Sequence, residues 1–299
     1  MSGGEPGWPD DDEVVEALRQ SGHLLEQEIA AGLETVGFAT ETNRAFADPD
    51  EGKSRELDVW ATRTLYEDDE RQLRVFIQLL IECKSSRAPF VVLTRPLGKG
   101  YRRSPPQELS FPVPEYHTNV TNAAGRSYRV VPAFFYLELD QQYWPWTDGR
   151  RGVAIIRLDR QKDKWAADNT GIFDSLVYPL AKAMLAFRNH FNPTGRATPV
   201  PGHWKYVGLF LPVVVLDSRL YVVDGSSNAP QVEVVQHVRV QRELRTKHLQ
   251  GLFGIDVVHR DYLLDWVSRV VVPFGEHVVA RVTAEPWLTT KTSPSVSGP

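Results

Sequence analysis

The sequence predicts a single α/β domain in which helices flank a central mixed β-sheet. Two observations lead to this prediction. Stretches with the 3.6-residue apolar period of a helix alternate along the chain with short runs of strand-forming residues, the pattern of layered α/β proteins. One of these runs, Leu73–Lys84, is apolar over most of its length, as expected of a central strand that is covered on both faces.

Composition narrows the class of protein. The chain has 299 residues, enough to bury a large core, and its 34 Lys and Arg against 38 Asp and Glu give a net charge of −4. This charge does not itself indicate nucleic-acid binding, which would depend on a local patch. The single cysteine excludes a disulfide framework and favours a reducing compartment. Neither a signal-peptide pattern nor an apolar run of about 20 residues is present, so we expect a cytoplasmic protein with no membrane contact.

The domain boundaries follow from composition. The first twelve residues and the last sixteen are rich in Gly, Pro, Ser and acidic residues with nothing to bury, so both ends are expected to be disordered tails. No repeat or long linker divides the remainder. The expected organisation is a tail at 1–12, one domain at 13–283 and a tail at 284–299, the domain comprising a periodic segment at 20–95, a proline-rich loop at 96–129 and a sheet-completing segment at 130–283.

The first elements are well marked. Apolar residues from Val14 to Val36 share one helical stripe, which predicts a helix over residues 13–36 that ends at Gly37. The acidic run Glu67–Glu70 predicts the turn of a hairpin. The first four strands are expected at 38–46, 57–66, 73–84 and 90–93.

The second half of the chain continues the alternation. Asp217 and Ser218 predict a hairpin turn between two apolar strands. Asp261 is a candidate N-cap for the last helix. The expected elements are strands at 130–139 and 152–158, a helix at 172–191, a hairpin formed by 207–216 and 219–223, a strand at 255–258 and a helix at 261–271.

Asp58, Glu82 and Lys84 are the most informative polar residues. Antiparallel counting from the Glu67–Glu70 turn places Asp58 opposite residues 79–81, one step from Glu82. Glu82 and Lys84 are two residues apart on one strand, so their side chains leave the same face. Charged groups at the end of a buried strand must be paired or must bind a metal ion.

Oxygen ligands of this kind suit a hard divalent cation. Mg²⁺ typically takes one or two carboxylates together with water and substrate phosphate, which fits Asp58 and Glu82. Lys84 carries no metal-binding lone pair, but its ammonium group can hold the attacking water and stabilise charge on a phosphate. Glu26 lies at the border of the apolar stripe of the first helix and is a third candidate ligand. The alternative for the Glu–Lys pair is a solvated surface ion pair.

These residues resemble the pattern of the PD-(D/E)xK, or restriction-endonuclease-like, nuclease superfamily. The resemblance covers residues 20–95: a helix with Glu26, then Gly37-Phe38, then Asp58 in RELDV, then Glu82 and Lys84 in IECK. It departs from the family pattern in three ways. Glu56-Leu57 stand where a Pro precedes the Asp, the two acids are 24 residues apart, and no Gln-containing helix motif follows Lys84.

The resemblance implies a restriction-endonuclease-like core and Mg²⁺-dependent phosphodiester hydrolysis, with Mn²⁺ able to substitute. It makes Asp58, Glu82 and Glu26 metal ligands, adds the backbone carbonyl of Cys83 to the shell, and places Lys84 at the nucleophilic water. DNA is the expected substrate, and a role in defence against foreign DNA is compatible with uncharacterised bacterial members. A homodimer and a regulatory protein partner both remain open.

Further basic residues are candidates for phosphate contacts. Lys99, Arg102 and Arg103 lie in the proline-rich loop around Tyr101, although a solvated loop explains them equally well. A second basic stretch beginning at Arg239 is interpreted as a solvated face. The rival hypothesis for the whole chain is a catalytically inactive nuclease-fold module that binds nucleic acid or a protein partner. A glycosidase with paired acids leaves Lys84 unexplained.

Overall fold

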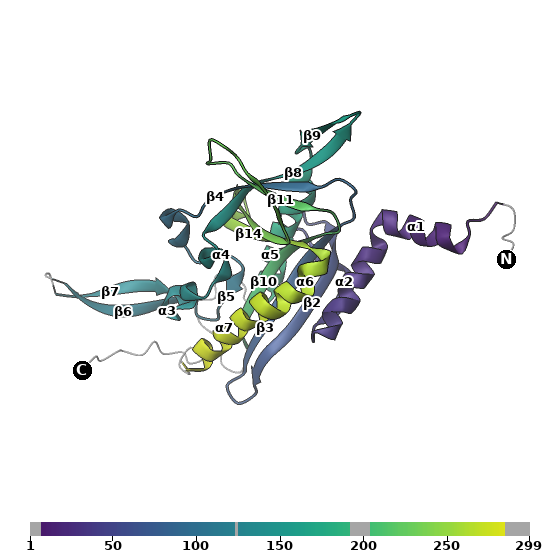
Figure 1. Ribbon diagram of the computed structural model, residues 1–299. Helices are drawn as coiled ribbons and strands as arrows, with labels where there is room; N and C mark the ends of the chain where they lie inside the picture. The colour runs from purple at the N-terminus through teal and green to yellow at the C-terminus, as the bar shows by residue number, and fades with distance from the viewer. Residues whose placement is uncertain (1–6, 123–124, 192–203, 285–299) are drawn as a thin grey trace.

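The computed structural model describes residues 7–122, 125–191 and 204–284, and these ranges form an α/β structure built on one large mixed sheet (Figure 1). The coarse fold class predicted from sequence is therefore confirmed. Within these ranges no helix is long and apolar enough to cross a membrane. The helical elements are α1 (Asp11–Ser21), α2 (His23–Thr35), η1 (Lys99–Arg102), α3 (Ala133–Tyr136), η2 (Leu139–Gln141), α4 (Trp144–Thr147), η3 (Phe173–Val177), α5 (Tyr178–Phe191), η4 (Arg260–Tyr262), α6 (Leu263–Trp266), η5 (Val267–Val271) and α7 (Val272–Ala284).

The main sheet follows the order β1-β2-β3-β10-β14-β13-β8-β4-β11-β12, with β5 on β10 and β9 on β8, while β6 and β7 form a separate hairpin. β3 lies inside the sheet, as its apolar run predicted, and pairs in parallel with β10. The strands are β1 (Ala39–Ala47), β2 (Ser54–Asp68), β3 (Leu73–Lys84), β4 (Phe90–Pro96), β5 (Leu109–Ser110), β6 (Glu115–Asn122), β7 (Gly125–Pro132), β8 (Arg150–Gln161), β9 (Lys164–Asp168), β10 (Lys205–Leu216), β11 (Leu220–Asp224), β12 (Val232–Val235), β13 (His237–Arg245) and β14 (Gln250–His259).

The sheet is strongly curled. β10 and β11 are five places apart in the strand order, about 24 Å in a flat sheet, yet only residues 217–219 join them. Residues 85–89 join β3 to β4 across the same number of places. The edge that carries β4 and β11 must therefore curl back over β3 and β10. Gly152 permits this curvature where β8 meets β13, because an added Cβ would lie 2.9 Å from the backbone oxygen of Arg239.

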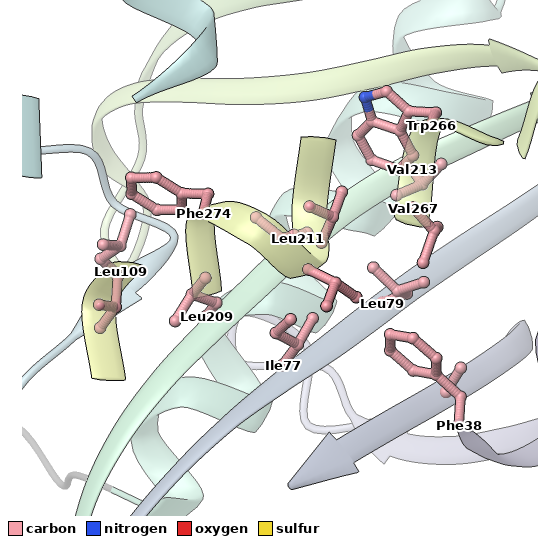
Figure 2. Packing of buried hydrophobic residues seen from close by; sticks show 14 of the residues in the cluster. Phe38, Ile77, Leu79, Leu109, Leu209, Leu211, Val213, Trp266, Val267 and Phe274 are labelled. Atoms are coloured by element: carbon pink, nitrogen blue, oxygen red, sulfur yellow. The ribbon is translucent and has the colours of Figure 1, made fainter. Parts of the chain in front are cut away.

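Each face of the central strands has its own core. Leu79 and Ile81 of β3 pack under α2 and the C-terminal helical segment, whereas Phe76 and Leu80 face the inside of the curl, which α5 fills. Figure 2 shows Phe274 and Val267 of the C-terminal segment lying over the strands of the first core. Alternate residues of β3 thus serve two cores, which explains its nearly continuous apolar sequence.

The first predicted helix is in fact two. α1 ends at Gly22, whose φ of 90° is left-handed, and α2 begins at the next residue. The apolar stripe continues across this break, so periodicity alone did not reveal it. Gly37, also left-handed with φ 84°, follows the end of α2 as expected. α1 contributes no buried residue and projects from the body of the molecule (Figure 1).

The middle of the chain differs from the sequence-based expectation. The predicted loop at 96–129 contains η1, β5, and the β6–β7 hairpin, whose strands pair from Glu115↔Pro132 to Asn122↔Gly125. The predicted strand at 130–139 is wrong beyond Pro132, where the chain turns into α3. Aromatic residues drive this change, since Phe134 packs edge-on against Tyr143 and Trp146 in the core.

The predicted hairpin of 207–216 with 219–223 is also wrong. Both strands exist, but β10 pairs with β3 and β14, and β11 pairs with β4 and β12. β10 is buried along most of its length, so it requires a partner on each side. The last helical segment begins after His259, which serves as N-cap in place of Asp261, and extends to Ala284.

The expected tails are only partly described. Residues 11 and 12 of the first expected tail belong to α1. Residues 1–6 and 285–299 lie outside the described residues.

Candidate active site

Asp58, Glu82, Lys84 and Glu26 form a group that we call the acidic site. It lies where the pairing of β2 with β3 ends. Val59 of β2 is opposite Ile81 of β3, so the next residue along each strand is Asp58 and Glu82. The hairpin turn lies at residues 69–72 and not at Glu67–Glu70 as predicted, because Glu67 and Asp68 still pair with β3. Counting from this turn would place Asp58 opposite Cys83, and a register shift between Thr64 and Tyr66 brings it opposite Glu82. The two carboxylates are therefore one step closer than the sequence predicted.

Two hydrogen bonds organise this pair. The backbone N–H of Cys83 donates to Oδ2 of Asp58 at 2.7 Å, which holds that carboxylate against β3. Nζ of Lys84 donates to Oε1 of Glu82 at 2.7 Å. The Glu82 side chain is 15% exposed and that of Lys84 is 33% exposed, so the pair faces an opening and is not sealed in the core.

Glu26 reaches the same region from α2. It lies in the first turn of that helix, where its backbone N–H donates to the carbonyl of Gly22, and its side chain is 11% exposed. The titratable side chain that contacts it within the described residues is His23, whose Nδ1 lies 3.4 Å from Oε1. The placement at the border of the apolar stripe is as the sequence predicted.

The pKa values of the three carboxyl groups are linked. Burial raises the pKa of Asp58, against the opposing effects of the Cys83 N–H and the Lys84 ammonium. Burial and then the charge of Asp58 raise the pKa of Glu82, and the same two causes raise the pKa of Glu26. Asp58 thus raises the pKa of both other acids, and the three carboxyl groups form a site of concentrated negative charge, as functional sites often do.

Cys83 has no nucleophilic role here. Burial raises the pKa of its thiol far above its usual range, so the sulfur stays protonated at neutral pH. Its side chain packs in the first core, on the face opposite to Lys84. Its backbone matters more, because the N–H and C=O groups of a strand residue point toward the same neighbouring strand. The Cys83 carbonyl is thus directed to the side of Asp58.

Only part of the predicted ligand set is placed to bind one metal ion. In the described part of the chain, no three side chains of His, Cys, Asp or Glu are arranged so that they could hold a metal ion together. Asp58 and Glu82, with the carbonyl of Cys83, leave the remaining positions to water. That donor set is all oxygen and suits Mg²⁺, which usually keeps several water ligands.

The predicted phosphate-binding residues are not brought to this site. β4 starts beside the site, where the N–H of Phe90 donates to the carbonyl of Arg219, and it leads away over about 20 Å. Lys99, Arg102 and Arg103 follow its far end. There Arg102 donates to the carbonyl of Trp146 at 2.8 Å, so it stabilises the loop.

Two residues have contacts that differ from those expected from the sequence. Asp217 accepts from Ser85 Oγ at 2.9 Å and from the Ser86 N–H at 2.9 Å, which fixes the chain immediately after Lys84. Arg239 is not on a solvated face; it is buried between Glu108 and Asp256, with which it forms ion pairs. In both cases the partners are more than 100 residues apart or on another strand, and no local pattern marks them.

Comparison of the chain with protein-family models, with curated proteins and with solved structures finds no significant match.

Proposed function

We propose that the chain is a Mg²⁺-dependent nuclease that hydrolyses phosphodiester bonds, with DNA as substrate and endonucleolytic cleavage as the mode. A role in defence against foreign DNA is part of the same proposal. One observation carries it: two carboxylates stand at adjacent positions of paired strands, and an ammonium group contacts one of them at 2.7 Å. This combination is suited to hydrolysis of a phosphate ester at a metal ion.

The residues have distinct roles in this proposal. Asp58, Glu82 and the Cys83 carbonyl hold the ion, and Glu26 adds negative charge beside them. A bound Mg²⁺ would activate water and neutralise charge on the phosphate oxygens. Lys84 positions the attacking water and stabilises negative charge at phosphorus. The hydrogen bond from the Cys83 N–H orients the Asp58 carboxylate before any substrate arrives.

The second candidate function is the catalytically inactive module. It is favoured by the observation that Glu26, Asp58 and Glu82 are not arranged, within the described residues, to bind one ion together. Against it stands the intact set of Asp58, Glu82 and Lys84. Such a module would bind nucleic acid or a protein with no dependence on Lys84.

Plasmid cleavage separates the two functions. Purified protein is incubated with supercoiled plasmid and Mg²⁺ or Mn²⁺, beside an EDTA control. We expect nicking that EDTA abolishes and that Lys84→Ala reduces by about 10²–10³-fold, because a charged group that stabilises the transition state is lost. Lys247→Ala, which removes an exposed lysine elsewhere, is the matched control.

Calorimetry completes the test. Lys84→Ala should still bind Mg²⁺, since Lys84 is not a ligand, whereas Asp58→Ala should bind it much more weakly. A fully active Lys84→Ala would refute the proposed mechanism. Absence of both cleavage and Mg²⁺ binding in the wild type would leave the inactive module as the better description.

A further inference from the structure

A second polar feature adjoins the acidic site. A groove of about 900 Å³ opens where residues 85–89 and 217–219 cross from the central strands to β4 and β11. Ser85 and Ser86 form part of its wall, directly after Lys84, and the end of α1 and the tip of the β8–β9 hairpin form other parts. The groove therefore begins one residue beyond the proposed catalytic lysine.

The charged side chains that line the groove sum to a net charge of +1. Arg19, Arg87 and Arg219 line it, against the acids Glu16 and Asp217. Asp217 already accepts hydrogen bonds from Ser85 and Ser86, and Glu16 forms a long contact of 3.5 Å with the highly exposed Arg87. Among the described residues neither Arg19 nor Arg219 has an ion-pair partner. Unpaired arginines on an open surface are suited to contact phosphate groups.

An exposed aromatic ring completes the groove. Trp165 lies on β9, is 56% exposed and lines the groove. Most large aromatic residues of this chain pack into the two cores, so this exposure is unusual within the described structure. A tryptophan face beside arginines is the arrangement that stacks bases while the arginines follow the backbone.

Gly22, which separates α1 from α2, lies between the groove and the acidic site. The Ser85 hydroxyl, whose one proton is directed to Asp217 at 2.9 Å, also lies 3.2 Å from the carbonyl oxygen of Arg19, and Ser85 Cβ lies 3.8 Å from where a Cβ on Gly22 would stand. α1 therefore leads from Gly22 toward the groove with Arg19, and α2 leads from the same residue toward the acids with Glu26. Ser85 therefore lies against the residues at which α1 ends and α2 begins.

We propose that this groove binds a single nucleic-acid strand, with phosphates at Arg19 and Arg219 and an unpaired base stacked on Trp165. The strand then continues past Ser85 to Lys84, and only this last step rests on the proposed nuclease function. A single strand is specified because stacking needs a free base face, which a duplex does not present along its length. Ribose and deoxyribose strands share this chemistry, and the experiment distinguishes them.

Binding is measured by fluorescence anisotropy in EDTA, with Lys84→Ala as the parent so that no strand is cut. The probes are fluorescein-labelled dT12, U12 and a 12-base-pair duplex. We expect the two single strands to bind more tightly than the duplex, and the tighter of the two identifies the sugar. Trp165→Ala should weaken binding by about 5- to 150-fold, while Trp165→Phe should retain most of it.

The role of the arginines is tested by the salt dependence of binding. Arg219→Gln should lower the slope of log affinity against log salt by about 0.7, the value for one phosphate contact on a single strand. Trp8→Ala and Arg269→Gln remove exposed residues of the same types outside the groove and should change neither quantity.

Two results would overturn the inference: equal binding by Trp165→Ala and Trp8→Ala, or tightest binding to the duplex. These results are independent of catalysis. If the wild-type protein cuts plasmid but Trp165→Ala binds normally, only the groove proposal fails. If the groove binds single strands but plasmid is never cut, only the nuclease proposal fails.

Discussion

Replacing Asp58 by Asn should make the metal-free protein more stable. The acidic site carries three carboxylates and one ammonium group, and each carboxyl pKa is raised by burial and, for Glu26 and Glu82, also by Asp58. Asparagine keeps an oxygen that accepts the hydrogen bond from the Cys83 N–H. Its amide protons can in turn donate to the neighbouring acids. The substitution therefore removes repulsion and retains the hydrogen bond.

The size of the effect follows from the geometry. Paired strand residues have Cα atoms about 5 Å apart, and two carboxylates about 6 Å apart repel by about 3 kcal/mol at an effective dielectric constant of about 20. Lys84 offsets part of this repulsion, because its ammonium group contacts Glu82. We expect a net gain of about 1–2 kcal/mol at pH 7, which corresponds to a rise in Tm of about 2–4 °C.

The sign reverses when Mg²⁺ is present. The wild-type protein gains about 2.7 kcal/mol at a Mg²⁺ concentration one hundred times its Kd, and the variant loses most of this gain. Thermal unfolding followed by circular dichroism, with EDTA or with Mg²⁺, should show the two Tm curves crossing. A lower Tm of Asp58→Asn in EDTA, or an equal response of both proteins to Mg²⁺, would refute the reasoning.

The pH dependence adds a second check. A carboxyl group whose pKa is raised in the folded state favours folding below its unfolded pKa, and this contribution is lost as pH rises through the folded pKa. The advantage of Asp58→Asn should thus be present at neutral pH and disappear as the wild-type Asp58 becomes protonated on acidification. Its persistence at low pH would indicate a cause other than charge.

Substitution of Asp48 is the matched control, because it should lower stability whereas Asp58→Asn should raise it. Its side chain is fully buried and accepts from Lys182 Nζ at 2.8 Å and from Arg55, which hold its pKa well below the usual range. The stabilisation is present above its unfolded pKa and is lost as pH falls below it. Asp48→Asn should therefore destabilise the protein at pH 7, by about 1–3 kcal/mol, since it leaves the buried Lys182 ammonium only its longer contacts with Asp50 at 3.7 Å and Glu51 at 3.5 Å.

Two further substitutions test the framework around the site. Gly22→Ala places a Cβ on a residue with φ 90°, so urea unfolding should show a loss of stability of about 1–2 kcal/mol. Displacement of α1 should also weaken binding of dT12. Unchanged stability and binding would contradict the role given to Gly22 between α1 and α2. Arg239→Met leaves Glu108 and Asp256 buried without their common cation. It should lower stability by about 3–5 kcal/mol in the same assay. A neutral effect would show that burial of these two acids is tolerated.

The acidic site could be predicted because it is local. Asp58, Glu82 and Lys84 belong to one hairpin, so the apolar run of β3 and the acidic turn at Glu67–Glu70 were enough to place them near one another. The turn itself lies at residues 69–72, two residues beyond the predicted one, and neither this offset nor the register shift at Thr64 could be foreseen. The resemblance to a nuclease family rests on these same residues and stays a prediction.

The curled sheet and the groove could not be predicted, because their determinants are distant in sequence. β10 and β11 look like a hairpin around Asp217, and nothing in either strand shows that its partners are β3 and β4. Arg239 looks solvated until Glu108 and Asp256 are seen beside it. Trp165 and Arg19 lie in separate segments, so their common surface appears only after folding.

The charges at this end of the sheet favour an order of events. The acidic site holds two net negative charges, from Glu26, Asp58 and Glu82 against Lys84, so a phosphate is repelled from it unless a cation is present. The groove beside it is positive and needs no ion. A nucleic-acid strand should therefore bind at Arg19, Arg219 and Trp165 whether or not a divalent cation is present, whereas its approach to Lys84 should depend on that cation. Binding in EDTA and cleavage in Mg²⁺ thus report on two adjacent parts of one surface, joined at Ser85.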